Sequence, residues 1–289
     1  MKKIFLLIVA VFMLQIVKAQ QLEAFQENEK FGIKESVTGK VVVPAKYDEI
    51  YSFSEGLAMV STAGKFGFID KTGKEIVQLT YAETSNFSEG LAAVSNGEEW
   101  GFIDKTGKEI IPLTYQEVNS FSEGLAAVII DDLAGYIDKT GKVVIPLTYD
   151  YCMPFAQGLA IVEKDGFSGV IDQKGNFVVS MRYTEIDDYS QGLAAASING
   201  KWGYINRQGE LVIAADYDYV FPFSENYAGV MIGDKGGYID LTGNIEIPMV
   251  YDRLGIFSNG TSLVEIAGKQ FYIDKKGNCV EKEGLTCPK

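Results

Sequence analysis

The stretch from Trp100 to Val128 decides the fold, and it reads WGFIDKTGKEIIPLTYQEVNSFSEGLAAV. Variants of this stretch recur along the chain with a constant step of 34 residues. The step is most regular at the glycine after the tryptophan, which recurs as Gly67, Gly101, Gly135, Gly169, Gly203 and Gly237. A fixed period without insertions is typical of tandem repeat proteins, whose units bury their apolar faces on one another.

Two further positions of the repeat recur with the same step of 34 residues. We call such a set of equivalent positions a column. A tyrosine recurs at Tyr47, Tyr81, Tyr115, Tyr149, Tyr183, Tyr217 and Tyr251. An aromatic residue recurs at Phe53, Phe87, Phe121, Phe155, Tyr189, Phe223 and Phe257. The copy over residues 31–47 is partial and holds one extra residue, and the copy from Gly260 decays after Gly277. We therefore expect a repeat array over residues 31–277 with atypical, capping copies at its ends.

Each copy reads as three short strands separated by turns. Residues 90–94 are apolar on both faces, residues 100–104 form a second strand, and residues 143–145 before Pro146 show the third. Pairs such as Asn96-Gly97 predict a tight hairpin, and the Asp-Lys-Thr-Gly segment at 104–107 predicts a turn in which the aspartate bonds to the backbone. No apolar period of 3.6 residues appears after residue 20, so the predicted fold class is all-β.

These columns resemble the bacterial WG-repeat family, whose units are named for a Trp-Gly pair. The pair itself is present at Trp100-Gly101 and Trp202-Gly203, whereas Ala134, Ser168 and Gly236 replace the aromatic in other copies. The resemblance extends over residues 31–277 and implies a repeat array with no shared reaction.

The assembly of the copies follows from their size. Propeller blades usually have four strands and about 40 or more residues, so three-stranded units of 34 residues favour an open, twisted array of about seven units. A closed, propeller-like ring is the alternative.

The N-terminal segment predicts export. Lys2 and Lys3 precede an apolar run from Ile4 to Val17, and small Ala19 follows, as in a secretory signal peptide over residues 1–19. A retained membrane anchor is the alternative, but the run is short for a bilayer that needs roughly 20 residues. Residues 20–30 are then a lead-in and residues 278–289 a C-terminal cap. We expect an exported protein of the periplasm, cell surface or extracellular space, without a membrane span after cleavage.

The composition argues against most catalytic chemistry and against nucleic acid as a partner. The net charge of −13 repels phosphate backbones, and the absence of histidine removes the usual proton carrier and zinc ligand. The acidic pairs Asp131-Asp132 and Asp187-Asp188 read as turn and link residues rather than as catalytic carboxylates. No calcium-loop motif is present. We expect no catalytic site, no metal site and no cofactor.

The three cysteines have different expected roles. Cys152 occupies a mostly apolar column and reads as a buried small side chain. Cys279 and Cys287 lie in the last, decaying copy and are candidates for a disulfide that pins the C-terminal cap of an exported chain.

The candidate binding residues are aromatic residues that stand at positions where other copies of the repeat have a different type of residue. Tyr151 and Tyr219 replace a glutamate, and Phe221 stands where other copies have Ser85, Asn119 or Asp187. Such rings suit a protein partner or stacking on sugars; extra packing between repeats is the alternative. Trp100 and Trp202 are read as core. We therefore predict a non-catalytic binding or scaffold module for an envelope or extracellular protein, with polysaccharide binding as the alternative.

Overall fold

A computed structural model describes residues 22–288 of the chain, and all the regular elements in that range are β-strands. The signal peptide predicted for residues 1–19 lies outside the described residues. The described part of the chain divides into two compact units, the first up to residue 80 and the second from residue 81. The part of the chain that the structure describes contains no helix that could cross a membrane.

The strands fall into four classes that follow one another in each repeat. The first class consists of two-residue link strands: β4 (Glu49–Ile50), β8 (Glu83–Thr84), β12 (Glu117–Val118), β16 (Tyr151–Cys152), β20 (Glu185–Ile186), β24 (Tyr219–Val220) and β28 (Arg253–Leu254). The second class contains the strands that pair with the links, and all of them except β29 are buried on both faces: β5 (Leu57–Thr62), β9 (Leu91–Ser95), β13 (Leu125–Ile130), β17 (Leu159–Lys164), β21 (Leu193–Ile198), β25 (Tyr227–Ile232) and β29 (Thr261–Ile266).

The third class carries the repeated glycine: β2 (Lys30–Glu35), β6 (Lys65–Asp70), β10 (Trp100–Asp104), β14 (Leu133–Asp138), β18 (Phe167–Asp172), β22 (Lys201–Asn206), β26 (Lys235–Asp240) and β30 (Lys269–Asp274). The fourth class forms the outer edge of each sheet: β3 (Val41–Tyr47), β7 (Glu75–Tyr81), β11 (Glu109–Tyr115), β15 (Val143–Tyr149), β19 (Phe177–Tyr183), β23 (Leu211–Tyr217), β27 (Ile245–Tyr251) and β31 (Cys279–Val280). An additional strand, β1 (Leu22–Glu27), starts the first sheet.

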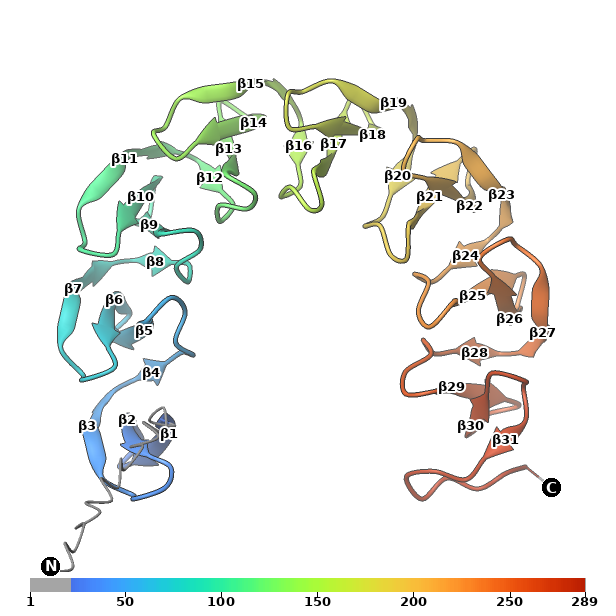
Figure 1. The fold of residues 1–289 in the computed structure, drawn as a ribbon, viewed down its shortest axis with the longest axis horizontal. Coiled ribbons are helices and arrows are strands. Elements are labelled where there is room, and N and C mark those ends of the chain that lie inside the picture. The colour runs from blue at the N-terminus through green and yellow to red at the C-terminus, as the bar shows by residue number, and fades with distance from the viewer. Residues whose placement is uncertain (1–21, 289) are drawn as a thin grey trace, which may run out of the picture. The chain divides into compact units, whose positions relative to one another are not determined.

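The strands form one antiparallel sheet per repeat, in chain order. The first unit holds the three-stranded sheet β1-β2-β3 and the four-stranded sheet β4–β7, and the second unit holds six four-stranded sheets that begin at β8. The prediction of three strands per repeat was therefore short by one, because the link before each buried strand adds a two-residue strand. The lead-in predicted for residues 20–30 likewise contains β1, which pairs with β2. Within the second unit the sheets form an open array (Figure 1).

The repeated glycine permits a close approach between two strands. A Cβ atom on Gly135 of β14 would lie only 2.6 Å from the carbonyl oxygen of Ile145 and 2.7 Å from that of Pro146. The pairing of β14 with β15 shifts register around this point, where the outer strand bulges. Pro146 is tolerated there because β15 is an edge strand, which needs no donor on its outer side.

The core lies between successive sheets rather than within one of them. One cluster of buried residues combines Tyr136 and Ile145 from the β12–β15 sheet with Val162 and Ile171 from the β16–β19 sheet. An aromatic pair crosses several of these boundaries, with ring centroids 4.8–4.9 Å apart: Phe102–Phe121, Tyr136–Phe155, Tyr204–Phe223 and Tyr238–Phe257. Each such pair adds about 0.5–1.5 kcal/mol beyond the area that it buries.

Hydrogen bonds from the Phe-Ser-Glu-Gly segment and its variants tie a sheet to the next one at four boundaries of the second unit. The serine hydroxyl donates to the carbonyl of the aromatic residue one repeat later at a distance of 2.7–2.8 Å: Ser88 to Phe121, Ser122 to Phe155, Ser190 to Phe223 and Ser224 to Phe257. The glutamate that follows accepts the glycine N–H of the next repeat, as Glu89 does from Gly124 and Glu225 from Gly260. We call this pair of contacts the Ser-Glu clamp.

A cation from a later turn completes the clamp. Lys139 Nζ lies 2.9 Å from the carboxylate of Glu89, and Lys275 Nζ lies 3.0 Å from that of Glu225. These contacts hold the pKa of both glutamates below its usual value, chiefly through the lysine hydrogen bond. The clamp therefore explains why serine, glutamate and lysine recur with the repeat.

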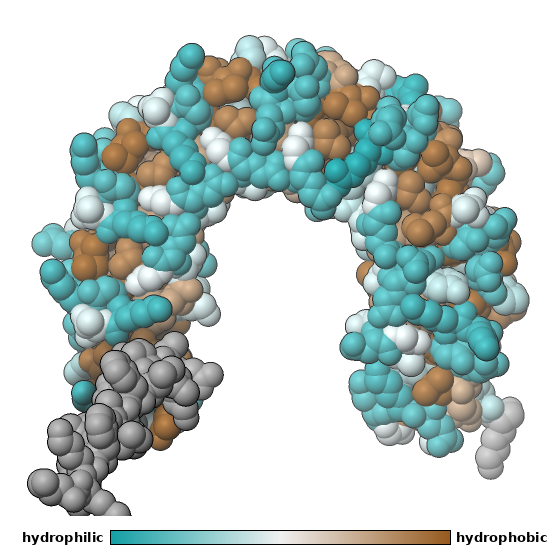
Figure 2. All heavy atoms as spheres, viewed as in Figure 1, coloured by the Kyte–Doolittle hydropathy of each residue, from teal (hydrophilic) through white to brown (hydrophobic). Residues whose placement is uncertain are grey.

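The surface that the sheets present is mixed. Figure 2 shows apolar side chains in separate patches along the array, with hydrophilic residues between them. Part of this apolar surface comes from the outer strands, where Val143, Phe177 and Leu211 are exposed.

Candidate binding surface

Two of the three aromatic departures predicted as binding residues meet in the structure. Tyr219 in β24 and Phe221 just after it lie edge to face, with ring centroids 5.1 Å apart. The Tyr219 side chain is 53% exposed, whereas Phe221 is half-buried. Together with Met231, Arg253 and Leu254 they line a groove of about 400 Å³ between the β24–β27 and β28–β31 sheets. We call it the Tyr219 groove.

The groove exists where a repeat lacks its tryptophan. Gly236 occupies the column of Trp100 and Trp202, and a Cβ atom there would lie 2.3 Å from the Met231 sulfur and 2.6 Å from a methyl carbon of Leu254. Met231 and Leu254 thus take up the space next to the backbone, and they form an apolar floor beside the Tyr219 ring.

Paired charges surround this floor. Asp218 accepts hydrogen bonds from Lys201 and from the Gly233 N–H, which hold the pKa of its carboxyl below the usual value. Asp252 is held in the same way by Lys235 and the backbone of the following turn. Arg253 is the most exposed charge of the rim, 78% accessible and 3.9 Å from Glu265.

Tyr151 is not part of this groove. It lies in β16, two sheets earlier, is 40% exposed, and lines a small pocket of about 60 Å³ with Glu117, Val118 and Cys152. The structure therefore brings together Tyr219 and Phe221 but leaves Tyr151 apart. Trp100 and Trp202 are half-buried, and each packs against a cluster that its own sheet shares with the next one.

The recurrent aspartates stabilise turns. Asp138 accepts hydrogen bonds from the Thr140 hydroxyl at 2.6 Å and from the backbone N–H groups of Thr140 and Lys142 at 2.9 and 3.1 Å. These bonds lower the pKa of the carboxyl. Asp132 lies in a hairpin turn, and its backbone N–H donates a hydrogen bond to the side-chain oxygen of Gln116. Residues 22–288 hold no group of three or more acidic, cysteine or histidine residues placed to bind a metal ion.

The cysteines differ in environment. Cys279 and Cys287 are joined by a disulfide that closes the last turn of the chain onto β31. Cys152 is a buried free thiol, and burial raises its pKa to about 12. The Cys152 thiol is therefore protonated and unreactive at neutral pH.

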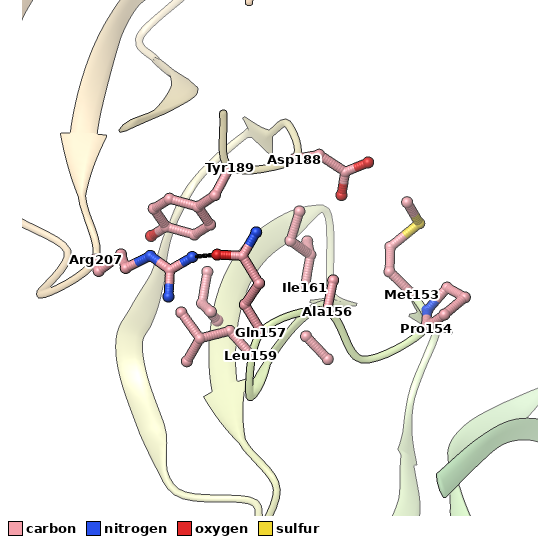
Figure 3. Close-up of a pocket in the computed structure, with 11 residues that line it drawn as sticks. Met153, Pro154, Ala156, Gln157, Leu159, Ile161, Asp188, Tyr189 and Arg207 are labelled. Atoms are coloured by element: carbon pink, nitrogen blue, oxygen red, sulfur yellow. Dashed lines mark hydrogen bonds between the residues drawn. The ribbon is translucent and has the colours of Figure 1, made fainter. Parts of the chain in front are cut away.

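A second cavity lies at a place that the sequence analysis did not single out. It has a volume of about 200 Å³ and lies between the β16–β19 and β20–β23 sheets, with Leu159, Ile161 and Val170 in its apolar lining and Tyr189 and Arg207 at its edge (Figure 3). We call this boundary the Val170 junction. The sequence feature that marks this cavity is the absence of an aromatic residue. Val170 stands at the position that Phe102 and Tyr136 occupy in other repeats, so no aromatic pair fills this boundary.

Comparison with known proteins identifies the repeat. The family model described as WG containing repeat matches seven times, at residues 37–66, 66–100, 100–133, 135–166, 169–202, 202–235 and 237–269. None of the curated proteins matches the sequence significantly.

One solved structure shares the fold at low sequence identity. A structure described as that of the eukaryotic initiation factor is 14% identical, with a TM-score of 0.55, and the match covers 89% of this chain and 82% of that one. Hsv2p of Kluyveromyces lactis is 13% identical over 77% of this chain and 92% of that one, with a TM-score of 0.41. The first of these likenesses supports a β-repeat fold built from blade-like sheets and says nothing of activity.

Proposed function

Since this chain belongs to the family of proteins with WG-containing repeats, we propose that it is a non-catalytic, exported binding module that holds a protein partner at its inter-repeat surface. Repeat arrays commonly bind partners along an extended surface, because each unit offers a similar rigid face. The observation that carries the proposal is the Tyr219 groove, where an exposed ring borders an apolar floor inside a rim of charges.

The chemistry of the groove favours a protein partner. Aromatic and arginine side chains are the residue types that contribute most to protein interfaces, and Tyr219 and Arg253 stand exposed on one rim. The carboxylates of Asp218 and Asp252 are already paired with lysines. An apolar side chain of the partner that enters the groove therefore does not meet an unpaired carboxylate. Polysaccharide binding is the second candidate, because an exposed tyrosine ring also stacks on sugars.

The proposal is tested by retention of an envelope extract on the immobilised chain from residue 20 onward. We expect retention to be lost after protease treatment of the extract and to fall at least tenfold in the Tyr219→Ala variant. Phe167→Ala is the matched control, since Phe167 is 45% exposed but lies outside the groove. Retention that survives proteolysis would support the glycan; retention unchanged by Tyr219→Ala would refute the groove as the site.

A further inference from the structure

The Val170 junction lacks both halves of the Ser-Glu clamp. Ala156 occupies the serine position, so no hydroxyl is present to donate to the Tyr189 carbonyl as Ser122 does to Phe155. Gln157 occupies the glutamate position. At the preceding boundary, the Gly158 N–H donates a hydrogen bond of 2.7 Å to the carboxylate of Glu123. Within residues 22–288, no side chain accepts the equivalent hydrogen bond from the Gly192 N–H.

The cation of the clamp is nevertheless present. Arg207 stands in the column of Lys139 and Lys275, each of which pairs with a glutamate carboxylate. Its own partner is the neutral side-chain oxygen of Gln157, and its guanidinium carbon lies 5.8 Å from the centre of the Tyr189 ring. Across residues 22–288, Arg207 forms no ion pair with a carboxylate. A guanidinium group has five N–H donors, so donors remain for an anion.

The cavity beside Arg207 is apolar and large enough for a side chain. It measures about 200 Å³, compared with roughly 150 Å³ for an apolar protein cavity that takes up benzene. Val170 is fully buried at its base, where Tyr136 and Tyr204 fill the corresponding space at neighbouring junctions. Tyr189 lies half-buried at the edge, and its hydroxyl donates to the Asn206 carbonyl at 3.1 Å.

We propose that the Val170 junction is a binding site for a carboxylate attached to a compact apolar group, such as a C-terminal leucine or a free N-acylated amino acid. The ligand carboxylate takes the place of the missing glutamate between Arg207 and the Gly192 N–H. Its apolar group enters the cavity over Val170 and Ile161. Asp188, which points away from Arg207 in Figure 3, is placed to accept the amide N–H of the ligand. The site lies two sheets from the Tyr219 groove and does not depend on it.

The test is calorimetric titration of the purified chain from residue 20 onward with N-acetyl-leucine and with its amide. We expect the acid to bind at least tenfold more tightly than the amide, because only the acid supplies the anion for Arg207. Gln157→Glu provides that carboxylate from the chain itself and is expected to weaken acid binding at least tenfold. Gln26→Glu makes the same chemical change on an exposed residue of β1 and is expected to leave binding unchanged.

Two further measurements complete the test. Val170→Tyr fills the cavity and is expected to abolish binding; the Gln157→Glu result decides the matter if that variant does not fold. A peptide ending in leucine that binds tenfold more tightly than N-acetyl-leucine identifies a chain terminus as the natural source, and equal affinity identifies a free acid. Equal binding of acid and amide, no binding of either, or normal acid binding by Gln157→Glu would overturn the proposal.

Discussion

The hydroxyl of Ser122 donates a hydrogen bond of 2.7 Å to the backbone carbonyl of Phe155, the aromatic residue of the next repeat. A side chain of one sheet thereby satisfies the backbone of its neighbour, in addition to the apolar packing between them. The same contact is formed by Ser88, Ser190 and Ser224, whereas Ala156 interrupts the series at the Val170 junction.

The serine half of the clamp is expected to contribute to stability wherever it is present. Ser122→Ala removes the donor to Phe155 and is expected to lower the free energy of unfolding by about 1 kcal/mol. Ala156→Ser introduces the donor at the Val170 junction and is expected to raise it by a similar amount. Urea denaturation monitored by tyrosine fluorescence measures both. Equal and negligible effects of the two substitutions would contradict a role for the hydroxyl.

The glycine of β14 is expected to be irreplaceable for a steric reason. Gly135→Ala places a Cβ atom within 2.6–2.8 Å of three backbone atoms of β15, which belong to rigid main chain and cannot turn away. We expect a loss of about 1–3 kcal/mol, as for other overpacked positions. Thermal unfolding of the variant measures the loss, and Ala134→Gly in the same strand shows the effect of simply changing side-chain size. An unchanged melting temperature in Gly135→Ala would show that β15 can move aside.

The turn aspartates are expected to make the fold sensitive to acid. Burial tends to raise the pKa of Asp240, but hydrogen bonds from Thr242 and Asn244 outweigh it and hold the value at about 2. An aspartate in the unfolded chain has a pKa of roughly 3.9, so the folded state favours the ionised form. The stabilisation is complete above about pH 4 and is lost as the pH falls through about 2.

The variant Asp240→Asn isolates this contribution. The wild type is expected to melt at a higher temperature than the variant at pH 5, and the difference is expected to shrink as the pH falls toward 2. Circular dichroism at several pH values follows it. A difference that stays constant over this range would show that the carboxylate charge does not matter to the turn.

The disulfide is expected to stabilise the last sheet. Replacing both Cys279 and Cys287 with serine removes a covalent link near the end of the chain, and we expect a loss of about 2–3 kcal/mol. Amide hydrogen exchange in β29 and β30 is expected to accelerate, with little change in β9 and β10. Treatment of the wild type with a reductant is the matched experiment, and uniform acceleration along the chain would argue against a local role.

The repeat made much of the fold predictable from the sequence. The period, the paired turns and the buried segment at Leu91–Val94 depend on local residue chemistry, and these features place three strands in each unit. The fourth strand was missed because Glu117–Val118 spans two residues, too few to show an alternation of apolar and polar positions. Its pairing with Ile129 and Val128 is decided by the contact between segments.

The candidate sites were less predictable. A search for added aromatic residues found Tyr219 and Phe221, but it also selected Tyr151, since a column position does not reveal which link residues become neighbours. The Val170 junction was missed because its cavity arises where side chains are smaller than those at the equivalent positions of other repeats, and the search was for larger ones. Ala156, Gln157, Val170 and Tyr189 each depart from the repeat, and only the fold shows that these departures meet at one boundary.

The Ser-Glu clamp joins only adjacent sheets, and the lysine that completes it also comes from the adjacent sheet. An in-frame gain or loss of 34 codons would therefore leave the remaining boundaries chemically complete, because no contact of the clamp spans the length of the array. Unequal recombination can therefore lengthen or shorten the array without changing the packing at the boundaries that remain. The two ends, with β1 and the disulfide-linked β31 segment, are the parts that this process must preserve.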